Sequence, residues 1–534
     1  MESADAVVVG AGHHGLVAAA VLADAGWDVV VLEGRDKVGG AVASVVHDGW
    51  VMDEFSACYP LAVTSPVLRE LRLEEHGLRW SRPDRVVAHL GDPADELGTL
   101  IHLDPQQTAR ALRDHDPADE AAWLELVDLW LRIKDPLLDA LLTRWPPVRS
   151  VGRLFASVGA RESPRLVREL LLPLSRMLEE RFRGERAKSL LAGNSAHADI
   201  PPQSPGSGMF GFLMAMLAQD VGFPSPTGGA GELAQSLRSR AESAGARVET
   251  GESVRRIVTA GGRVVGVETY AGRRVRARRA VVADTAAPAL YRSLLAPGAV
   301  SAGLLRALDT QFEWDLPTVK VNLRLSGPLP WTAREAHGAG VVHVGQDSAG
   351  LVRWFADLGS GVVPQDPFAL LGQMTTTDPT RSPTGTETVW IYSHLPRGRT
   401  DDESGNLLAE RLDGMLDRFA PGWRDLVAER WVELPSDLER ADPNLVGGAV
   451  GGGTSQVMQQ AIFRPVLGTG GPRTPVSGLY LGSAAAHPGG GVHGACGYLA
   501  ARAALTDSAW WGRPRQQLEL ATLHWLYRRD RPRP

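Results

Sequence analysis

Residues 5–33 read DAVVVGAGHHGLVAAAVLADAGWDVVVLE, and this stretch decides the fold. A short apolar run is followed by the pattern GxGxxG, by an alanine-rich segment that reaches Ala25, and by a second apolar run that ends in Glu33. This order predicts a strand, a helix and a second parallel strand. Such a βαβ unit is typical of a dinucleotide-binding domain, with a chance glycine loop as the alternative.

Each glycine of this unit has an expected structural role. We expect Gly10 to permit the tight turn, Gly12 to let a pyrophosphate approach the backbone around Ala11, and Gly15 to let the helix pack on the strand. The start of the helix presents unpaired N–H groups and partial positive charge to the phosphate. Glu33 stands where a carboxylate accepts hydrogen bonds from both ribose hydroxyls, which disfavours NADP and its ribose 2′-phosphate.

The next residues, GRDKVGGAVAS (34–44), favour FAD over NAD. In flavoproteins that resemble glutathione reductase, the acid at the second strand is followed by a basic residue and a pair of glycines. Here these are Arg35 and the pair Gly39 and Gly40, which lets the chain pass closely over an extended pyrophosphate. An ordinary glycine turn is the alternative.

Composition narrows the class of protein. The chain has 534 residues, enough for two to four domains, and 44% of them are hydrophobic, as in soluble globular proteins. A net charge of −6 argues against nucleic acid as the main partner. The two cysteines, Cys58 and Cys496, form no CxxC pair, which excludes a disulfide scaffold, a cysteine zinc site and a dithiol centre. We expect no metal site and a reducing, cytoplasmic setting.

Two stretches bear on location. The first strand begins within five residues, which leaves no room for a signal peptide, and MFGFLMAMLA (209–218) is too short to span a bilayer. We therefore expect no transmembrane helix. After Trp511 the chain carries six arginines, and residues 518–529 are amphipathic. This tail predicts either a packing segment or peripheral adsorption to anionic lipid.

Three motifs spread along the chain carry a family resemblance. They are VVVGAGHHGLVAA (7–19), PTGGAGELAQSL (226–237) and GLYLGSAAAHPGGGVHGACG (478–497). Together they resemble the phytoene desaturase family of FAD-dependent oxidoreductases, in particular its phytoene-dehydrogenase-related branch. The resemblance implies that the C-terminal glycines return to the first domain and close over the flavin. Gly490, Gly491 and Val492 would then start a helix whose amides face the N1–C2=O edge of the flavin.

Residues 247–284 alternate apolar and polar positions and predict a three-stranded meander beside the flavin domain. By resemblance, Val254 contacts the adenine through its backbone. Nine arginines lie in 247–279. With Tyr270 as the one interleaved aromatic residue, a solvated face accounts for them better than a nucleic-acid surface does.

The expected fold class is α/β, with a Rossmann-type, glutathione-reductase-like FAD-binding domain. A discontinuous, mixed α+β substrate domain and a helical region complete it. Apolar residues at helical spacing, from Trp123 to Ile133, predict the helical region, and strands are expected at 318–325 and 387–394. We expect the chain to divide as follows: 1–70, 226–300 and 471–534 for the FAD-binding domain, 71–225 for the helical part, and 301–470 for the mixed part.

The resemblance implies an FAD-dependent dehydrogenase, or desaturase, that acts on a C–C bond of a largely apolar small molecule by hydride transfer to flavin N5. Amine (C–N) oxidation, non-redox isomerisation and a flavin-bound interaction protein without turnover are the alternatives. A second GxGxxG unit is absent, so oxygen, a quinone or another carrier is the expected electron acceptor.

His487 is the candidate catalytic residue, because it can take a substrate proton or orient the loop. His13 and His14 are expected to face solvent or the meander. MFGFLMAMLA predicts a buried core helix or an apolar wall beside the flavin.

These motifs predict that one non-covalent FAD copurifies with the protein. Glu33→Arg should lower FAD occupancy, because it removes the ribose acceptor and places a cation there. Absorbance of the flavin released on denaturation, relative to protein, measures the occupancy. Release of NAD, or of no flavin, would contradict the prediction.

Overall fold

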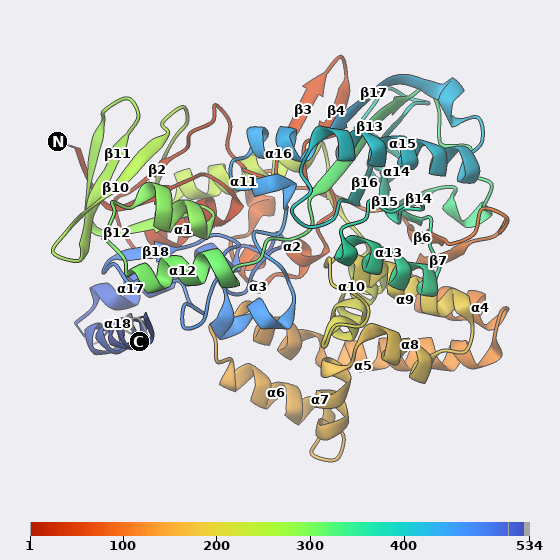
Figure 1. The fold of residues 1–534 in the computed structure, drawn as a ribbon, viewed down its shortest axis with the longest axis horizontal. Helices are drawn as coiled ribbons and strands as arrows, with labels where there is room; N and C mark the ends of the chain where they lie inside the picture. Colours follow the sequence, from red (N-terminus) through yellow and green to blue (C-terminus); the bar gives the residue numbers. More distant parts are fainter. Residues whose placement is uncertain (1, 511, 528–534) are drawn as a thin grey trace.

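The computed structural model describes residues 2–510 and 512–527. Two seven-stranded sheets and a helical region make up the fold (Figure 1). In Figure 1 the first sheet lies at the left, the second at the upper right, and the helical region below the second sheet. None of the described helices is long and apolar enough to cross a bilayer.

The first sheet is centred on β1 (Glu2–Val9), with β2 (Val29–Leu32) on one side and β12 (Arg274–Ala283) on the other, all parallel. These strands are apolar where they pair, because both faces of the sheet are covered. Segments from three distant parts of the chain share this sheet, which confirms the Rossmann-type fold class. Its other strands are β9 (Arg247–Glu249), β10 (Val254–Ala260), β11 (Arg263–Thr269) and β18 (Leu479–Leu481).

Helices cover one face of the first sheet. The meander β10–β11–β12 continues this sheet from β1 to its edge strand β10. The covering helices are α1 (His13–Asp24), α11 (Ala230–Ser243) and α17 (Ala495–Ser508). α1 and α17 approach so closely that a Cβ on Gly497 would lie 1.8 Å from the carbonyl oxygen of His14. Many arginines of the meander pair with acids at the sheet margin, for example Arg273 with Glu249, as expected for a solvated face.

The second sheet is antiparallel except for one parallel pair, β14 with β6. The strands predicted at 318–325 and 387–394 are confirmed. The stretch 71–225 differs from its purely helical prediction, because it supplies β6 and β7 to this sheet. The order is β17 (Val427–Glu433), β13 (Thr318–Leu325), β16 (Glu387–His394), β15 (Ala369–Gln373), β14 (Ala339–Val344), β6 (Arg85–Leu90) and β7 (Thr99–His102).

The helical region packs against the second sheet through a common apolar core. The predicted face from Trp123 to Ile133 is buried on α5, as expected. Residues 163–181 form two helices, α7 and α8, which are separated at Pro173. MFGFLMAMLA lies on α10, which is largely buried in this core. The helices are α4 (Pro105–Arg113), α5 (Pro117–Leu142), α6 (Val148–Val158), α7 (Ser163–Leu171), α8 (Leu174–Arg181), α9 (Glu185–Ala196) and α10 (Ser207–Val221).

Shorter elements and peripheral helices complete the described chain. α18 (Arg513–Tyr527) contains most of the predicted amphipathic stretch 518–529, whose last two residues lie outside the described residues. The others are β3 (Ser44–His47), β4 (Trp50–Asp53), β5 (Trp80–Ser81), β8 (Ser225–Pro226), α2 (Pro60–Thr64), α3 (Pro66–Glu70), α12 (Ala302–Gln311), α13 (Ser348–Ser360), α14 (Met374–Thr377), α15 (Asp402–Phe419), α16 (Pro435–Ala441) and short helical turns at 73–76, 289–294, 334–336, 423–426, 446–448, 457–459 and 461–463.

Gly193 on α9 lies against two buried histidines of the second sheet. A Cβ at Gly193 would lie 2.4 Å from Nδ1 of His343 and 2.5 Å from Nδ1 of His89, whose strands are neighbours. Gly193→Ala should therefore destabilise the protein by about 1–3 kcal/mol through overpacking. Gly414→Ala on α15 is the matched control, because no atom lies within 4 Å of its Cβ position.

The thermal unfolding midpoint of each variant measures this difference. Gly414→Ala should leave the midpoint unchanged or raise it, since alanine favours a helix by up to about 1 kcal/mol over glycine. An equal midpoint for Gly193→Ala and wild type would contradict the tight contact with the two histidines.

Candidate cofactor and active site

The first glycine turn joins β1 to α1 in the conformation that the sequence predicts. Gly10 has a φ of +95°, which disfavours other residues, and its N–H donates to the carbonyl of Leu32. A Cβ on Gly15 would lie 2.2 Å from the carbonyl oxygen of Gly10. The turn therefore tolerates only glycine at these two positions, and it presents bare backbone at the carboxyl edge of the parallel strands.

Glu33 follows β2 directly and holds this turn. Its Oε2 accepts the N–H of Ala11 at 2.7 Å, and its Oε1 accepts the N–H of Arg35 at 2.9 Å. The Arg35 guanidinium donates to Glu54 at 3.0 Å and to the carbonyl of Gly40 at 3.3 Å. One carboxylate thus links the two segments that the sequence assigned to the same dinucleotide.

The second glycine pair stacks on the first turn. Gly39 donates its N–H to the carbonyl of Ala11 at 2.8 Å, and a Cβ on Gly40 would lie 3.3 Å from the Cα of Gly12. Both Gly39 and Gly40 have positive φ, at +116° and +58°. The two loops therefore meet backbone to backbone, as the sequence predicted for a chain that passes over a pyrophosphate.

The meander returns to the same edge of the sheet. Just before β10, Gly251 donates its N–H to the carbonyl of Arg35, and Glu252 donates to the carbonyl of Glu33, each at 2.7 Å. Val254 is the first residue of β10, is buried and pairs with Thr269. The structure therefore brings the backbone before Val254 directly against Glu33 and Arg35.

The C-terminal glycine stretch reaches the start of α1. A Cβ on Gly491 would lie 3.1 Å from Leu61, and a Cβ on Gly490 would lie 2.6 Å from the carbonyl oxygen of Gly451. Val492 packs at the margin of the core that contains α1. The prediction that a helix starts at Gly490 to Val492 is wrong. α17 begins at Ala495, because Gly494 before it has a φ of +72°.

His14 is buried and His13 is half-buried against the C-terminal glycine stretch, rather than facing solvent or the meander, which corrects the sequence prediction. His13 lies against Gly491, and the His14 ring is 5.2 Å from that of His493. Burial lowers the pKa of His13 to about 4 and that of His493 to about 3. These imidazoles are neutral at physiological pH, so the phosphate turn gains no cation from them.

His487 connects the glycine stretch to the helical region. Its Nε2 donates to the carbonyl of Thr143 at 2.9 Å, and its ring lies edge-on to Trp145 with centroids 6.4 Å apart. The other ring nitrogen, Nδ1, is buried and has no hydrogen-bond partner among the described residues. Burial also lowers the pKa of His487. The contact with Thr143 fixes the tautomer that leaves Nδ1 as an acceptor.

Sequence reasoning missed two buried groups around these loops. Arg464 lies under the C-terminal stretch and donates to four carbonyls, those of Thr454, Gly451, Gly453 and Ala484. Asp284 follows β12, and its Oδ2 accepts the N–H of Gly15 at 2.8 Å. A polar residue at the carboxyl end of a buried parallel strand was the available signal for Asp284. Arg464 carries no signal in the sequence.

Among the described residues, one group of three side chains, His14, His493 and Cys496, has ligand atoms within 4.8 Å of one another. Nδ1 of His493 accepts the N–H of Ala495 at 3.1 Å, and the Cys496 thiol lies 3.5 Å from the carbonyl oxygen of Gly489. His493 and Cys496 thus contact backbone groups of the loop, whereas both ring nitrogens of His14 have no hydrogen-bond partner among the described residues. We assign this group no metal.

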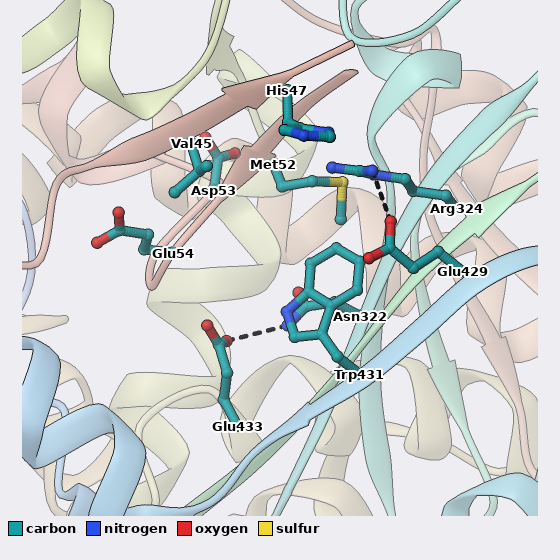
Figure 2. A pocket seen from close by; sticks show the side chains of 10 residues that line it. All are labelled: Val45, His47, Met52, Asp53, Glu54, Asn322, Arg324, Glu429, Trp431 and Glu433. Carbon is teal, nitrogen blue, oxygen red and sulfur yellow. Dashed lines mark hydrogen bonds and ion pairs between the residues drawn. The ribbon is translucent and has the colours of Figure 1, made fainter. Parts of the chain in front are cut away.

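Figure 2 shows a surface hollow of about 380 Å³ between the hairpin β3–β4 and the strands β13 and β17. Four of its ten lining residues are acids, and each pairs with a neighbour. Glu54 pairs with Arg35, Glu429 with Arg324, and Glu433 with Asn322. Asp53 pairs with the buried Arg381. The hollow therefore offers no unpaired acid to a ligand, and we assign it no role.

The residues at the carboxyl edge of the first sheet fit FAD. Glycines leave backbone exposed on two stacked loops, and Glu33 offers a carboxylate for ribose hydroxyls. Buried polar atoms without a hydrogen-bond partner among the described residues, Nε2 of His13 and Oγ1 of Thr285, lie on segments next to these loops. Because the histidines of this set are neutral and several of its other side chains are acids, backbone dipoles rather than cations would receive the diphosphate of FAD.

Comparison with known proteins agrees with this site. Residues 15–505 match the model of a family described as flavin containing amine oxidoreductase. The chain is similar to "Pyridine nucleotide-disulfide oxidoreductase domain-containing protein 2" of Rattus norvegicus, at 30% identity over 94% of this chain and 93% of the relative. It is also similar to the "zeta-carotene-forming phytoene desaturase" of Myxococcus xanthus, at 26% identity over 91% and 90% of the two chains.

A solved oxidoreductase from Methanosarcina mazei shares the fold, with a TM-score of 0.60 and 16% identity over 94% of this chain and 99% of the other. The relatives confirm the resemblance to phytoene desaturases. The chain therefore belongs to the flavin containing amine oxidoreductase family and is an FAD-dependent oxidoreductase.

Proposed function

We propose that the protein removes two hydrogens across a C–C bond of a largely apolar small molecule. The observation that carries this proposal is the similarity to a phytoene desaturase along nine tenths of both chains. The helical region supports it, because α10 places a methionine-rich helix in the core shared with the second sheet, and the one charged residue of this helix, Asp220, lies near its C-terminal end. FAD, when bound, supplies the hydride acceptor.

We assign cofactor binding to the loops at the carboxyl edge of the first sheet. Glu33 holds the ribose, and the segment before β10 holds the adenine side, because it contacts Glu33 directly. The C-terminal stretch covers the flavin side, since it reaches His13. The residues of this proposed site are Gly10, Ala11, Gly12, Gly15, Glu33, Arg35, Gly39, Gly40, Val254, Gly490, Gly491 and Val492.

His487 is the proposed proton acceptor, because its Nδ1 lone pair is free and its ring is neutral at physiological pH. The hydrogen bond to Thr143 gives it a second role, since it ties the glycine stretch to the end of α5. Both roles use the same tautomer, and they predict different effects of substitution.

Amine oxidation is the second candidate, and the family description supports it. On β16, the rings of Trp390 and Tyr392 stack with centroids 5.8 Å apart and an interplanar angle of 25°. Such a pair could form one wall of an aromatic amine site. Tyr480 does not take part, because its hydroxyl donates to Asp507 within the first domain.

An apolar substrate suggests a contact with membrane lipid. Trp510, Leu518 and Trp525 are exposed at the C-terminal end of the described chain, with 83%, 68% and 65% of their surface accessible. We propose that this surface adsorbs peripherally to lipid, where an apolar substrate would dissolve.

Anaerobic mixing with candidate substrates tests the reaction class. Acyclic isoprenoid alkenes should bleach the visible flavin absorbance, and a product with one more double bond should appear. Primary and secondary amines should leave the spectrum unchanged. Amine-dependent bleaching, with ammonia and hydrogen peroxide released in air, would instead support the second candidate.

His487→Ala separates the two roles of this histidine. If Nδ1 accepts the proton, flavin reduction should slow by about 100- to 10,000-fold while FAD stays bound. His337→Ala is a matched control, because His337 also donates through Nε2 to a backbone carbonyl, that of Trp331. Stopped-flow reduction normalised to bound flavin measures both variants. A rate within about threefold of wild type, far below the general-base range, would exclude proton transfer.

The pH dependence follows from the lowered pKa of His487. The neutral imidazole is the active form, so the reduction rate should stay constant as pH falls to the ordinary histidine value. It should decline only below that value, and His487→Ala should lose this acid limb.

A further inference from the structure

The phosphate turn contains a buried carboxyl group that the proposed function does not use. Asp284 follows β12 and accepts the N–H of Gly15 through Oδ2 at 2.8 Å, and only 8% of its surface is accessible. The same oxygen lies 2.5 Å from the place that a Cβ on Gly12 would occupy. Asp284 therefore lies directly against the turn that receives a diphosphate.

Every titratable neighbour that acts on Asp284 is acidic. Glu33 faces it from the end of β2, Asp442 from the loop after α16, and the Cys496 thiol from α17. Asp442 itself is buried and lies 3.4 Å from the Cβ position of Gly40. Arg35 is nearby, but it pairs with Glu54. An ionised Asp284 would add a further negative charge beside a doubly charged diphosphate, with no cation to offset it.

Burial, together with the charges of Asp442 and Glu33, raises the pKa of Asp284 to about 8 against the opposing hydrogen bond from Gly15. The group is thus a neutral acid at physiological pH. A neutral carboxyl oxygen can still accept the N–H of Gly15, so the turn keeps its conformation.

We propose that Asp284 is a cofactor-site residue that must carry a proton for FAD to bind, so that the protein releases FAD when this carboxyl group ionises. The proposal depends on FAD binding and is independent of the substrate. The only bond that changes is the O–H bond of the Asp284 carboxyl group: at alkaline pH the proton passes to solvent base, and FAD leaves unaltered.

The sign of the effect follows from linkage. Well below pH 8 the carboxyl group is protonated with or without FAD, so the dissociation constant stays constant there. Above this pH, binding must take up a proton that the free protein has lost. The dissociation constant should therefore rise by up to about tenfold for each further pH unit.

Dilution of the holoenzyme tests the proposal. Wild-type protein is diluted into buffers between about pH 6 and 9.5, and the fluorescence of released FAD gives the dissociation constant, while circular dichroism confirms the fold. Asp284→Asn should show no such rise, because an amide keeps the acceptor for Gly15 and does not ionise. Asp442→Asn is the matched control. It should keep the rise with a midpoint at lower pH, because one of the charges that raise the pKa of Asp284 is gone.

A constant dissociation constant for wild type across this range would overturn the proposal without any variant. An equal rise in Asp284→Asn would also overturn it, because another group would then carry the proton. If Asp284→Asn does not fold, Asp284→Ser replaces it as a neutral acceptor of similar size. Loss of FAD from folded Asp284→Asn at neutral pH would show that the carboxylate itself is required, contrary to the proposal.

Discussion

The structure depends on the close approach of bare backbone at the carboxyl edge of the first sheet. Gly39 bonds to Ala11, a Cβ on Gly40 would press on Gly12, and a Cβ on Gly15 would collide with Gly10. Side chains at these positions would separate β1, α1 and the following loop. The parallel sheet sets where its strand ends lie, and the missing side chains leave room for a dinucleotide between them.

Charge at this edge is arranged without cations. His14 and His493 are buried, His13 is half-buried, and all three are neutral, while Arg35 is paired and three acids lie around the turn. Amide dipoles at the start of α1 would therefore be the main attraction for a diphosphate at the proposed site. In such a site the protonation of one carboxyl group changes the net charge around the turn, which is why the protonation state of Asp284 matters for FAD binding.

The C-terminal stretch joins the cofactor loops to the rest of the molecule. Arg464 donates hydrogen bonds to carbonyls of the loop 451–454 and to that of Ala484. Asp315 accepts the N–H groups of Gly451 and Gly453 in the same loop. His487 binds the end of α5, and Ser65 donates to the carbonyl of His493 at 2.6 Å. Displacement of either the helical region or the first domain would therefore shift the residues proposed to face the flavin.

The sequence by itself determined the βαβ unit, its glycines and Glu33, the meander, and the strands at 318–325 and 387–394. These features follow from local periodicity and from glycines whose backbone geometry excludes other residues. Only the tertiary structure decided where α17 starts, that His14 is buried and His13 half-buried, and that 71–225 supplies two strands to the second sheet. It alone placed Asp284 on Gly15 and Arg464 on four carbonyls. Burial and hydrogen-bond partners depend on segments hundreds of residues apart, and no local pattern records which segments will meet.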